Sequence, residues 1–130
     1  MNVKRKTILE KGRGNIRKQA KLEYLYEKES RYFAQVSESI KDLAISELRH
    51  LGAGNIKPVF RGIWFTASKR NLYRITYRTR LLSRILAPLT SFPCRDKDEL
   101  YRGAKKIRWE EFLSQKKTLA VSANVSESSI

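Results

Sequence analysis

The chain of 130 residues is long enough for one small domain, or for one small domain and the start of a second. Its 28 Lys and Arg outnumber 13 Asp and Glu, which gives a formal net charge of +15. Such an excess predicts a polyanionic partner, most often a nucleic acid. The alternatives are a basic surface that docks on an anionic membrane and a basic protein without a polyanionic partner.

The sequence also argues against several other classes of protein. A single cysteine, Cys94, and a single histidine, His50, exclude an internal disulfide framework and a Cys/His zinc site within this sequence. No apolar segment approaches the roughly 20 residues of a membrane span, and no apolar run follows the charged N-terminus as in a secretory signal. We therefore expect a soluble, cytoplasmic protein without a membrane partner.

Residues 1–31 are expected to form a flexible basic N-terminal arm. They contain ten Lys and Arg against four Glu, and Gly12 and Gly14 interrupt the first half. Apolar residues recur at helical spacing only for a turn or two. A solvated tail without a role explains this composition equally well.

The first predicted elements of the globular part are a strand and a helix. Tyr32 to Val36 is a short apolar run that is typical of a strand. An amphipathic helix follows, capped by Ser37 or Ser39 and ended by Gly52 in a left-handed conformation. Its predicted inner face has apolar residues at helical spacing, namely Ile40, Leu43, Ala44, Leu48 and Leu51.

A hairpin and a second helix come next. Residues 55–59 and 63–65 read as two strands joined by a tight turn at 60–62, and Pro58 places the first of them at a sheet edge. Ser68 is expected to cap the second helix, which turns Leu72 and Ile75 inward. A fourth strand is predicted in the latter part of 81–89. The order strand, helix, strand, strand, helix, strand predicts an α/β protein with a ferredoxin-like domain at residues 32–93.

Residues 94–130 contain a third helix and the opening of another unit. Asp96 and Glu99 predict a capping box, with acids in the first turn and lysines in the last. Trp109 and Phe112 are expected to pack in a core, and residues 118–125 alternate like a strand. Nothing else in the sequence pairs with that strand, so the second domain is expected to be truncated.

Catalytic patterns were not found. The Gly-rich Lys11-Gly12-Arg13-Gly14 lies in the arm and not after a strand, and one His and one Cys cannot supply a nucleophile with its base. We interpret His50 as a partly exposed helix-end residue and Cys94 as a half-buried loop thiol. Asp42 and Glu47 are interpreted as solvated acids on the polar side of their helix. No catalytic, cofactor-binding or metal-binding residue is therefore predicted.

The functional signal is a basic stretch between Lys69 and Arg108, with twelve Lys and Arg against three acids. Its tyrosines could stack on bases or simply pack, and the charges could form a solvated face. Like charges four residues apart on one stripe of the second helix repel each other by a few tenths of a kcal/mol, which a phosphate backbone would relieve. That stripe consists of Arg70, Arg74 and Arg78, with Tyr73, Tyr77 and Tyr101 interleaved along the stretch. The predicted RNA contacts are Arg74, Arg78, Arg80, Arg84, Arg102, Lys105, Lys106 and Arg108.

The chain from Tyr32 onward resembles the N-terminal part of the K/L-type large-subunit ribosomal-RNA methyltransferases, which carry a THUMP domain. The segments that carry the resemblance are Tyr32-Phe33-Ala34 leading into Ser37, Leu43 with Glu47-Leu48, Leu51-Gly52-Ala53, Val59, Gly62-Ile63-Trp64-Phe65, Leu72-Tyr73, Arg80 to Leu86, Asp98 to Tyr101, Ile107 to Glu111 and Thr118 to Val121. The resemblance covers residues 32–130 and implies a ferredoxin-like domain at 32–93, followed by a partial THUMP domain at 94–130.

The resemblance also implies a function. In that family an RNA-binding THUMP module accompanies a domain that uses S-adenosylmethionine to methylate guanine N2 of large-subunit ribosomal RNA. We expect this chain to supply RNA binding. The cofactor would be bound by a methyltransferase portion that this sequence lacks, and a separately encoded chain is one possible source of that portion. Three rivals remain: a ribosome- or protein-interaction module, a truncated remnant without a role, and an intact small enzyme. Residues 1–31 match nothing in the family.

Overall fold

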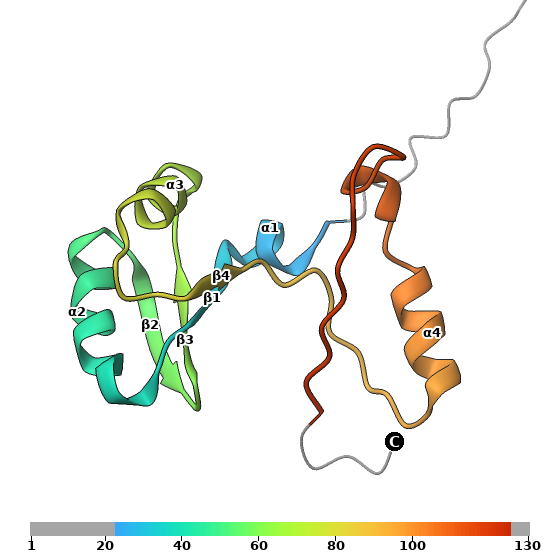
Figure 1. Cartoon of the computed structure of the whole chain (residues 1–130), viewed down its shortest axis with the longest axis horizontal. Coiled ribbons are helices and arrows are strands. Elements are labelled where there is room, and N and C mark those ends of the chain that lie inside the picture. The colour runs from blue at the N-terminus through green and yellow to red at the C-terminus, as the bar shows by residue number, and fades with distance from the viewer. Residues whose placement is uncertain (1–22, 126–130) are drawn as a thin grey trace, which may run out of the picture.

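The computed structural model describes residues 23–125 and shows two lobes that meet at a short N-terminal helix (Figure 1). The residue bounds are α1 Leu25–Glu29, β1 Arg31–Gln35, η1 Glu38–Ile40, α2 Lys41–His50, β2 Gly54–Val59, β3 Gly62–Thr66, α3 Lys69–Arg78, β4 Arg84–Leu86, α4 Lys97–Lys105 and η2 Trp109–Glu111. Here η1 and η2 are single 3-10 turns. We call residues 31–86 the sheet unit and residues 87–125 the C-terminal region.

The sheet unit contains four antiparallel strands in the order β2-β3-β1-β4. The central strands β3 and β1 are not consecutive in sequence. Helix α2 connects β1 to the edge strand β2, and α3 connects β3 to the opposite edge strand β4. This is the predicted ferredoxin-like βαββαβ arrangement. Pro58 lies on the edge strand β2, as its missing backbone donor requires.

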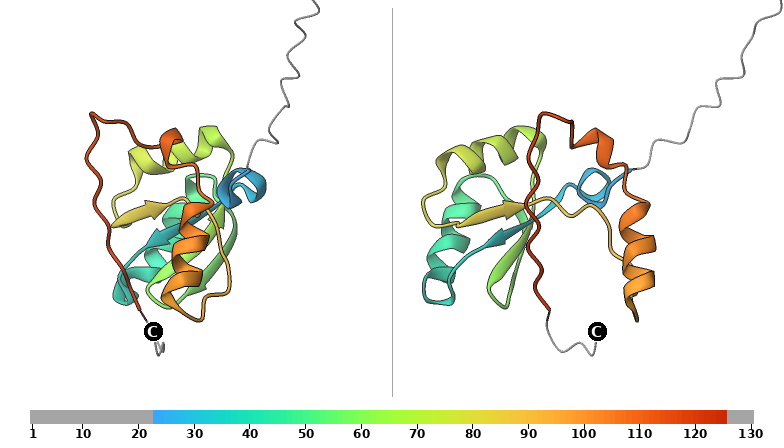
Figure 2. Two further views of the ribbon diagram at one scale, coloured as in Figure 1. Left: turned by 90° about the vertical axis from the view of Figure 1, so that its right-hand side faces the viewer. Right: turned by 45° about the vertical axis from the view of Figure 1, so that its right-hand side comes forward.

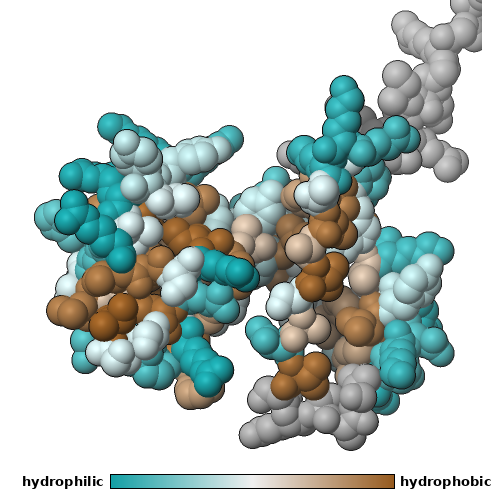
Figure 3. Space-filling model, in the orientation of Figure 1, coloured by the Kyte–Doolittle hydropathy of each residue, from teal (hydrophilic) through white to brown (hydrophobic). Residues whose placement is uncertain are grey.

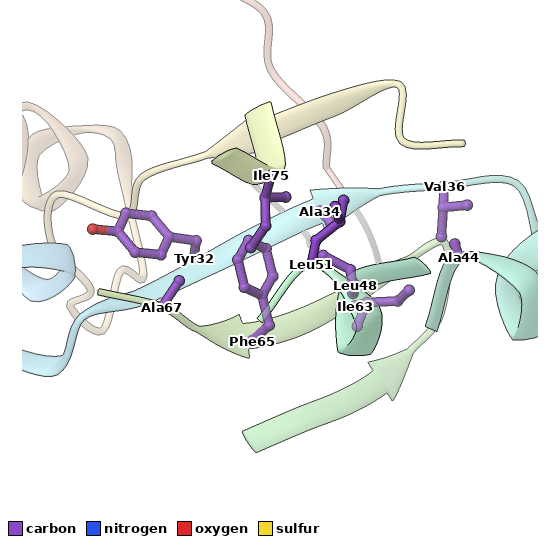
Figure 4. Close-up of a cluster of buried hydrophobic side chains, with 10 residues drawn as sticks. All are labelled: Tyr32, Ala34, Val36, Ala44, Leu48, Leu51, Ile63, Phe65, Ala67 and Ile75. Atoms are coloured by element: carbon purple, nitrogen blue, oxygen red, sulfur yellow. The ribbon is translucent and has the colours of Figure 1, made fainter. Parts of the chain in front are cut away.

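The core lies between one face of the sheet and the helices α2 and α3 (Figure 4). Alternate residues of a strand point to opposite faces, so every second residue of β1 and β3 enters this core. Phe65, Leu48, Ile63 and Ile75 are its largest fully buried side chains. The complete cluster is Tyr32, Ala34, Val36, Ala44, Leu48, Leu51, Ile63, Phe65, Ala67 and Ile75.

Local signals place most of the boundaries as predicted. Ser68 Oγ accepts the backbone N–H of Asn71 at 3.2 Å and so caps α3. Gly52 follows α2 with φ of +95°, a conformation that favours glycine. Asp96 Oδ1 accepts the N–H of Glu99 at 2.7 Å at the start of α4. The Glu99 carboxylate bonds the N–H of Arg95 at 2.8 Å, so the predicted capping box is displaced by one residue.

Two predictions about α2 were wrong. Its N-terminus is a 3-10 turn, and neither predicted serine caps it, because the Ser37 and Ser39 hydroxyls lie 3.0 Å apart and bond each other. Leu43 is 62% exposed. The helix is rotated so that the line through Ala44 and Leu48 faces the sheet, and Leu43 lies one residue, or about 100°, away from that line.

The turn between β2 and β3 is fixed by Glu38. Its carboxylate lies 2.6 Å from Lys41 Nζ and also accepts the backbone N–H of Arg61, a turn residue with φ of +57°. Lys41 donates in addition to the carbonyl of Val59. The Lys41 ammonium and the Arg61 amide lower the pKa of Glu38 below its ordinary value.

Residues 24–31 belong to the folded part and not to an N-terminal arm. Arg31 pairs with Thr66 in the sheet, and Tyr24 is only 3% exposed. The rest of the predicted arm, residues 1–22, lies outside the described residues. The expected boundary at residue 31 was therefore drawn too late, because the buried Tyr24 is followed by the Glu and Lys residues of α1, which give the segment the composition of an arm.

Helix α1 joins the sheet unit to the C-terminal region, as the two turned views show (Figure 2). Leu25 N–H donates to Leu89 O at 3.1 Å and Tyr26 N–H to Pro88 O at 3.0 Å. A line of aromatic rings runs through the joint, with centroids 5.1 to 6.3 Å apart. Its members, in spatial order, are Phe112, Tyr24, Tyr26, Tyr32 and Phe65.

The C-terminal region differs from the sequence-based prediction in two places. Residues 118–125 form no strand and are exposed throughout, and no described strand pairs with them. Trp109 is 39% exposed, and its indole N–H donates to the Ala104 carbonyl, so it is not a core residue. Phe112, by contrast, is partly buried against Tyr24 at 5.1 Å between ring centroids, as a packing residue should be.

Candidate nucleic-acid interface

Helix α3 presents a basic surface and contains no acid of its own, and Glu27 of α1 lines a pocket with Lys69 and Tyr73. Its sequence, Lys69 to Arg78, contains four Lys and Arg and no Asp or Glu. Arg70, Arg74 and Arg78 are all exposed, as their spacing predicts, while Ile75 faces the core. Tyr73 and Tyr77 are 65% and 91% exposed, so packing in this chain does not explain them.

Arg80 is held beside this surface by Glu47 of α2. The Glu47 carboxylate accepts the Arg80 N–H at 2.9 Å, the Thr79 hydroxyl at 2.7 Å and the Leu81 N–H at 3.4 Å. Glu47 is therefore not the solvated acid expected from the sequence. It orders the turn after α3, in which the exposed Arg80 follows Arg78 by two residues.

Arg84 lies apart from the α3 arginines. It is exposed at the start of β4, opposite Gln35 in the register of β1. The neighbouring Ile85 packs against the core, so Arg84 points to the sheet face that lies away from the helices. The predicted contacts on α3 and on β4 therefore occupy opposite layers of the sheet unit.

The remaining predicted contacts lie in the C-terminal region. Arg102 and Lys106 line a groove with residues 90–93 and Glu99. Arg102 Nε donates to the Asp98 carbonyl at 3.3 Å, and Lys105 Nζ lies 5.8 Å from the ring centroid of Tyr101. All three cations are exposed, on α4 or directly after it.

Arg108 differs from the other predicted contacts. It is partly buried, it forms an ion pair with Glu111, and its Nε has no hydrogen-bond partner among the described residues. Glu111 in turn accepts the Tyr24 hydroxyl at 3.0 Å. Burial raises the pKa of Tyr24 above its ordinary value, and the Glu111 carboxylate raises it further. The Arg108 charge is thus partly neutralised within the joint at α1.

The predicted residues consequently form three groups and not one face: α3 with Arg80, β4 with Arg84, and the cations of the C-terminal region. The space-filling view is hollowed between the lobes, with hydrophobic surface beside the hollow and hydrophilic side chains around the outside (Figure 3). Sequence reasoning passed over Arg31, Phe33 and Trp64, which lie on the same sheet face as Arg84. The sequence signal for them is weak, because Phe33 and Trp64 stand between apolar neighbours and the strand period alone does not tell which face is buried.

The described residues contain neither a cluster of metal ligands nor a glycine-rich loop after a strand. Within 23–125 there is no group of three His, Cys, Asp or Glu suited to a metal ion. Cys94 is partly buried, with its thiol 3.3 Å from the Asp96 carbonyl, and His50 is exposed at the end of α2. Among residues 23–125 no glycine lies between the end of a strand and the start of the next helix. These residues therefore do not fit S-adenosylmethionine, whose binding loops are glycine-rich and follow a strand.

None of the helices among residues 23–125 is both long and apolar enough to cross a membrane.

Comparison with known proteins agrees with the two-part organisation. The family model for the RlmL ferredoxin-like domain matches residues 31–86, and the THUMP domain model matches residues 94–130. The fold and these matches define the chain as a ferredoxin-like domain followed by a THUMP domain. Over these two domains the chain is similar to the proteins named ribosomal RNA large subunit methyltransferase K/L.

Two of the individual relatives are named ribosomal RNA large subunit methyltransferase K/L, and a third is named more generally as an RNA methyltransferase. The chain is 36% identical over 100 residues to ribosomal RNA large subunit methyltransferase K/L of Syntrophotalea carbinolica, and 37% over 95 residues to that of Photobacterium profundum. A candidate RNA methyltransferase of Synechocystis sp. is 39% identical over 90 residues. The alignments cover 77%, 73% and 69% of this chain but 14%, 13% and 23% of the three relatives.

Proposed function

We propose that this chain is the RNA-binding region of an S-adenosylmethionine-dependent ribosomal-RNA methyltransferase and that it acts on the large-subunit RNA in the cytoplasm. The observation that carries the proposal is helix α3, which contains no acid of its own and displays four exposed Lys and Arg together with two exposed tyrosines. Exposed cations gain free energy from phosphates by releasing the bound counterions of the nucleic acid. The THUMP match and the names of the relatives support RNA as the polyanion.

The binding mode in this proposal is recognition of shape and backbone. Arg74, Arg78 and Arg80 contact phosphates along one side, and the cations of α4 extend the contact. Arg108 contributes less than the others, because it is paired with Glu111. Guanine-N2 methylation and the binding of S-adenosylmethionine belong to a methyltransferase domain, in a longer polypeptide or in a separately encoded chain.

Equilibrium binding to a structured ribosomal-RNA hairpin tests the proposal. Fluorescence anisotropy is measured across a series of salt concentrations, with duplex DNA of equal length as the competitor. We expect micromolar or tighter binding that prefers RNA, and a salt slope that falls by about 2 in the Arg74→Ala/Arg78→Ala variant, because each phosphate contact contributes about one unit.

The matched control is Arg49→Ala/Lys116→Ala, which removes two exposed positive charges from other surfaces and should leave the slope within about half a unit of the unmodified chain. Equal weak binding to RNA and DNA that both double variants retain would refute the α3 surface. Binding that disappears only when residues 1–22 are deleted would favour the rival hypothesis of a charged interaction module.

A further inference from the structure

The face of the sheet that points away from α2 and α3 carries aromatic and basic side chains in ordered rows. We call it the open face. One row crosses all four strands and consists of Lys57, Trp64, Phe33 and Leu86. The next row consists of Val59, Gly62, Gln35 and Arg84, and Arg31 lies on the other side of the first row, opposite Thr66.

The aromatic side chains lie on the two central strands. The rings of Phe33 and Trp64 have centroids 5.0 Å apart and planes inclined at 63°. A Cβ at Gly62 would lie 2.0 Å from the Phe33 ring, so the ring lies directly over this glycine. The glycine thus lets Phe33 lie flat against the sheet with its other side outward. Both aromatic residues are only partly buried.

Cations surround the two rings. The Arg31 guanidinium lies 4.3 Å from the ring centroid of Trp64, and Lys57 and Arg84 are exposed on the flanking strands. None of the four strands contains an Asp or a Glu. The acid nearest in sequence, Glu29, pairs with Arg31 at 3.5 Å, and both side chains remain more than two-fifths exposed.

This combination selects the class of partner. Protein interfaces are enriched in aromatic residues but depleted in Lys, whereas unpaired RNA supplies flat bases and phosphates together. A four-stranded sheet with aromatic residues on its central strands is a general solution for stacking unpaired bases, and guanidinium planes stack on bases as well. The Arg31 guanidinium already stacks on one face of the Trp64 ring, so a base at that face would extend this stack or replace the guanidinium.

We propose that the open face binds unpaired nucleotides of RNA, with bases stacked on Phe33 and Trp64 and phosphates contacted by Arg31, Lys57 and Arg84. The proposal rests on the proposed function only in that RNA is the ligand. The site differs from the α3 surface, because the two lie on opposite layers of the sheet unit. One RNA can therefore engage α3 through a helical segment and the open face through a loop or a single-stranded flank.

Trp64 fluorescence provides a direct test. The sequence has two tryptophans, so a Trp109→Phe chain reports on Trp64 alone. We titrate it with an unstructured oligouridylate of about ten nucleotides and with the hairpin. The expected result is saturable quenching by the oligouridylate. Addition of Phe33→Ala should weaken this binding by roughly 5-fold to 150-fold, since one base–aromatic stack is lost.

Three further variants separate stacking from folding and from charge. Leu43→Ala removes an exposed apolar side chain of α2 and should leave oligouridylate binding unchanged. Lys57→Glu/Arg84→Glu alters only exposed cations and should weaken binding even if Phe33→Ala fails to fold. Trp64→Phe keeps an aromatic ring and should retain most of the affinity, as monitored by anisotropy of labelled RNA.

The outcomes separate this site from the α3 surface. Tight hairpin binding with unquenched Trp64, and no effect of Phe33→Ala or of the charge reversals, would overturn the open-face proposal and leave the proposed function intact. If the unmodified chain bound neither the hairpin nor the oligouridylate, both the open-face proposal and the proposed function would be overturned. A blue shift of Trp64 emission with rising protein concentration, without RNA, would show that the open face is covered by a second copy of the chain, which also overturns the proposal.

Discussion

The two lobes are stabilised in different ways. Every buried apolar side chain of the described residues lies between Tyr24 and Ile75, and α4 buries only a glycine. The sheet unit therefore has its own core, whereas the C-terminal region is held by polar contacts, by Phe92 against Gly103 and by Phe112 against Tyr24. The cations of α3 are therefore carried by a unit with a fully buried core, whereas those of α4 are carried by a helix that buries almost no apolar side chain.

The largest test of this difference is Phe65→Ala. Phe65 is fully buried at the centre of the sheet unit, and truncation should lower the free energy of unfolding by about 3–5 kcal/mol. Chemical denaturation followed by circular dichroism measures the loss. Leu100→Ala, on the half-exposed surface of α4, should cost about 0.5 kcal/mol or less. Equal losses at the two positions would show that the lobes share one core.

A substitution in the C-terminal region should act locally. The Cβ of Gly103→Ala would lie 2.1 Å from the Phe92 ring, so the ring must move away from α4. We expect a cost of about 1–3 kcal/mol in local stability. Hydrogen exchange should then rise across residues 97–105 while the strands keep their protection. A matching rise in β1 and β3 would contradict the independence of the two lobes.

Glu47→Ala should affect the turn that displays Arg80. Loss of the three hydrogen bonds to residues 79–81 should cost about 1–2 kcal/mol and should expose the Arg80 and Leu81 amides to exchange. Hairpin affinity should also fall slightly, since Arg80 loses its fixed position. Asp42→Ala, which removes an exposed acid of the same helix, serves as the control and should change neither quantity.

The joint between the lobes should respond to alkaline pH. The pKa of Tyr24 is raised above its ordinary value of 10.0 by burial and by Glu111. The unfolded chain therefore releases this proton at a lower pH than the folded chain, so stability is retained below about pH 10 and falls above it. Tyr24→Phe should show a smaller loss between about pH 9 and pH 11 in thermal unfolding. An identical loss in both proteins would show that Tyr24 ionisation is not coupled to folding.

The sequence predicted the order of the elements well, because each depends on local chemistry. Ser68, Gly52 and Pro58 act within a few residues of themselves, and β1 and β3 are short apolar runs whose composition favours strands. The rotation of α2 was less predictable, since Leu43 and Ala44 are both apolar and only the sheet decides which of them faces inward. The predicted strand at 118–125 failed for a related reason, because an alternating sequence does not by itself specify the strand that it would pair with.

The candidate site was predictable in charge but not in arrangement. The α3 stripe follows from helical geometry, so its exposure was foreseeable. The separation of Arg84 from Arg80 was not, because a strand turns neighbouring residues to opposite faces and the register is set by distant pairing. Glu47 shows the same limit, since its partners lie 32 to 34 residues away.

The aromatic line through α1 has a consequence for the order of events during folding. Tyr24 and Glu111, which share a hydrogen bond, are separated by 87 residues of chain. During synthesis α1 emerges long before Glu111, and a contact across so long a loop carries a large entropic cost until the intervening sheet unit has formed. We therefore expect the joint to close last and to open first. In a nascent chain whose sheet unit has already folded, Tyr24 would stay exposed until the C-terminal region leaves the ribosome and Glu111 and Phe112 can cover it.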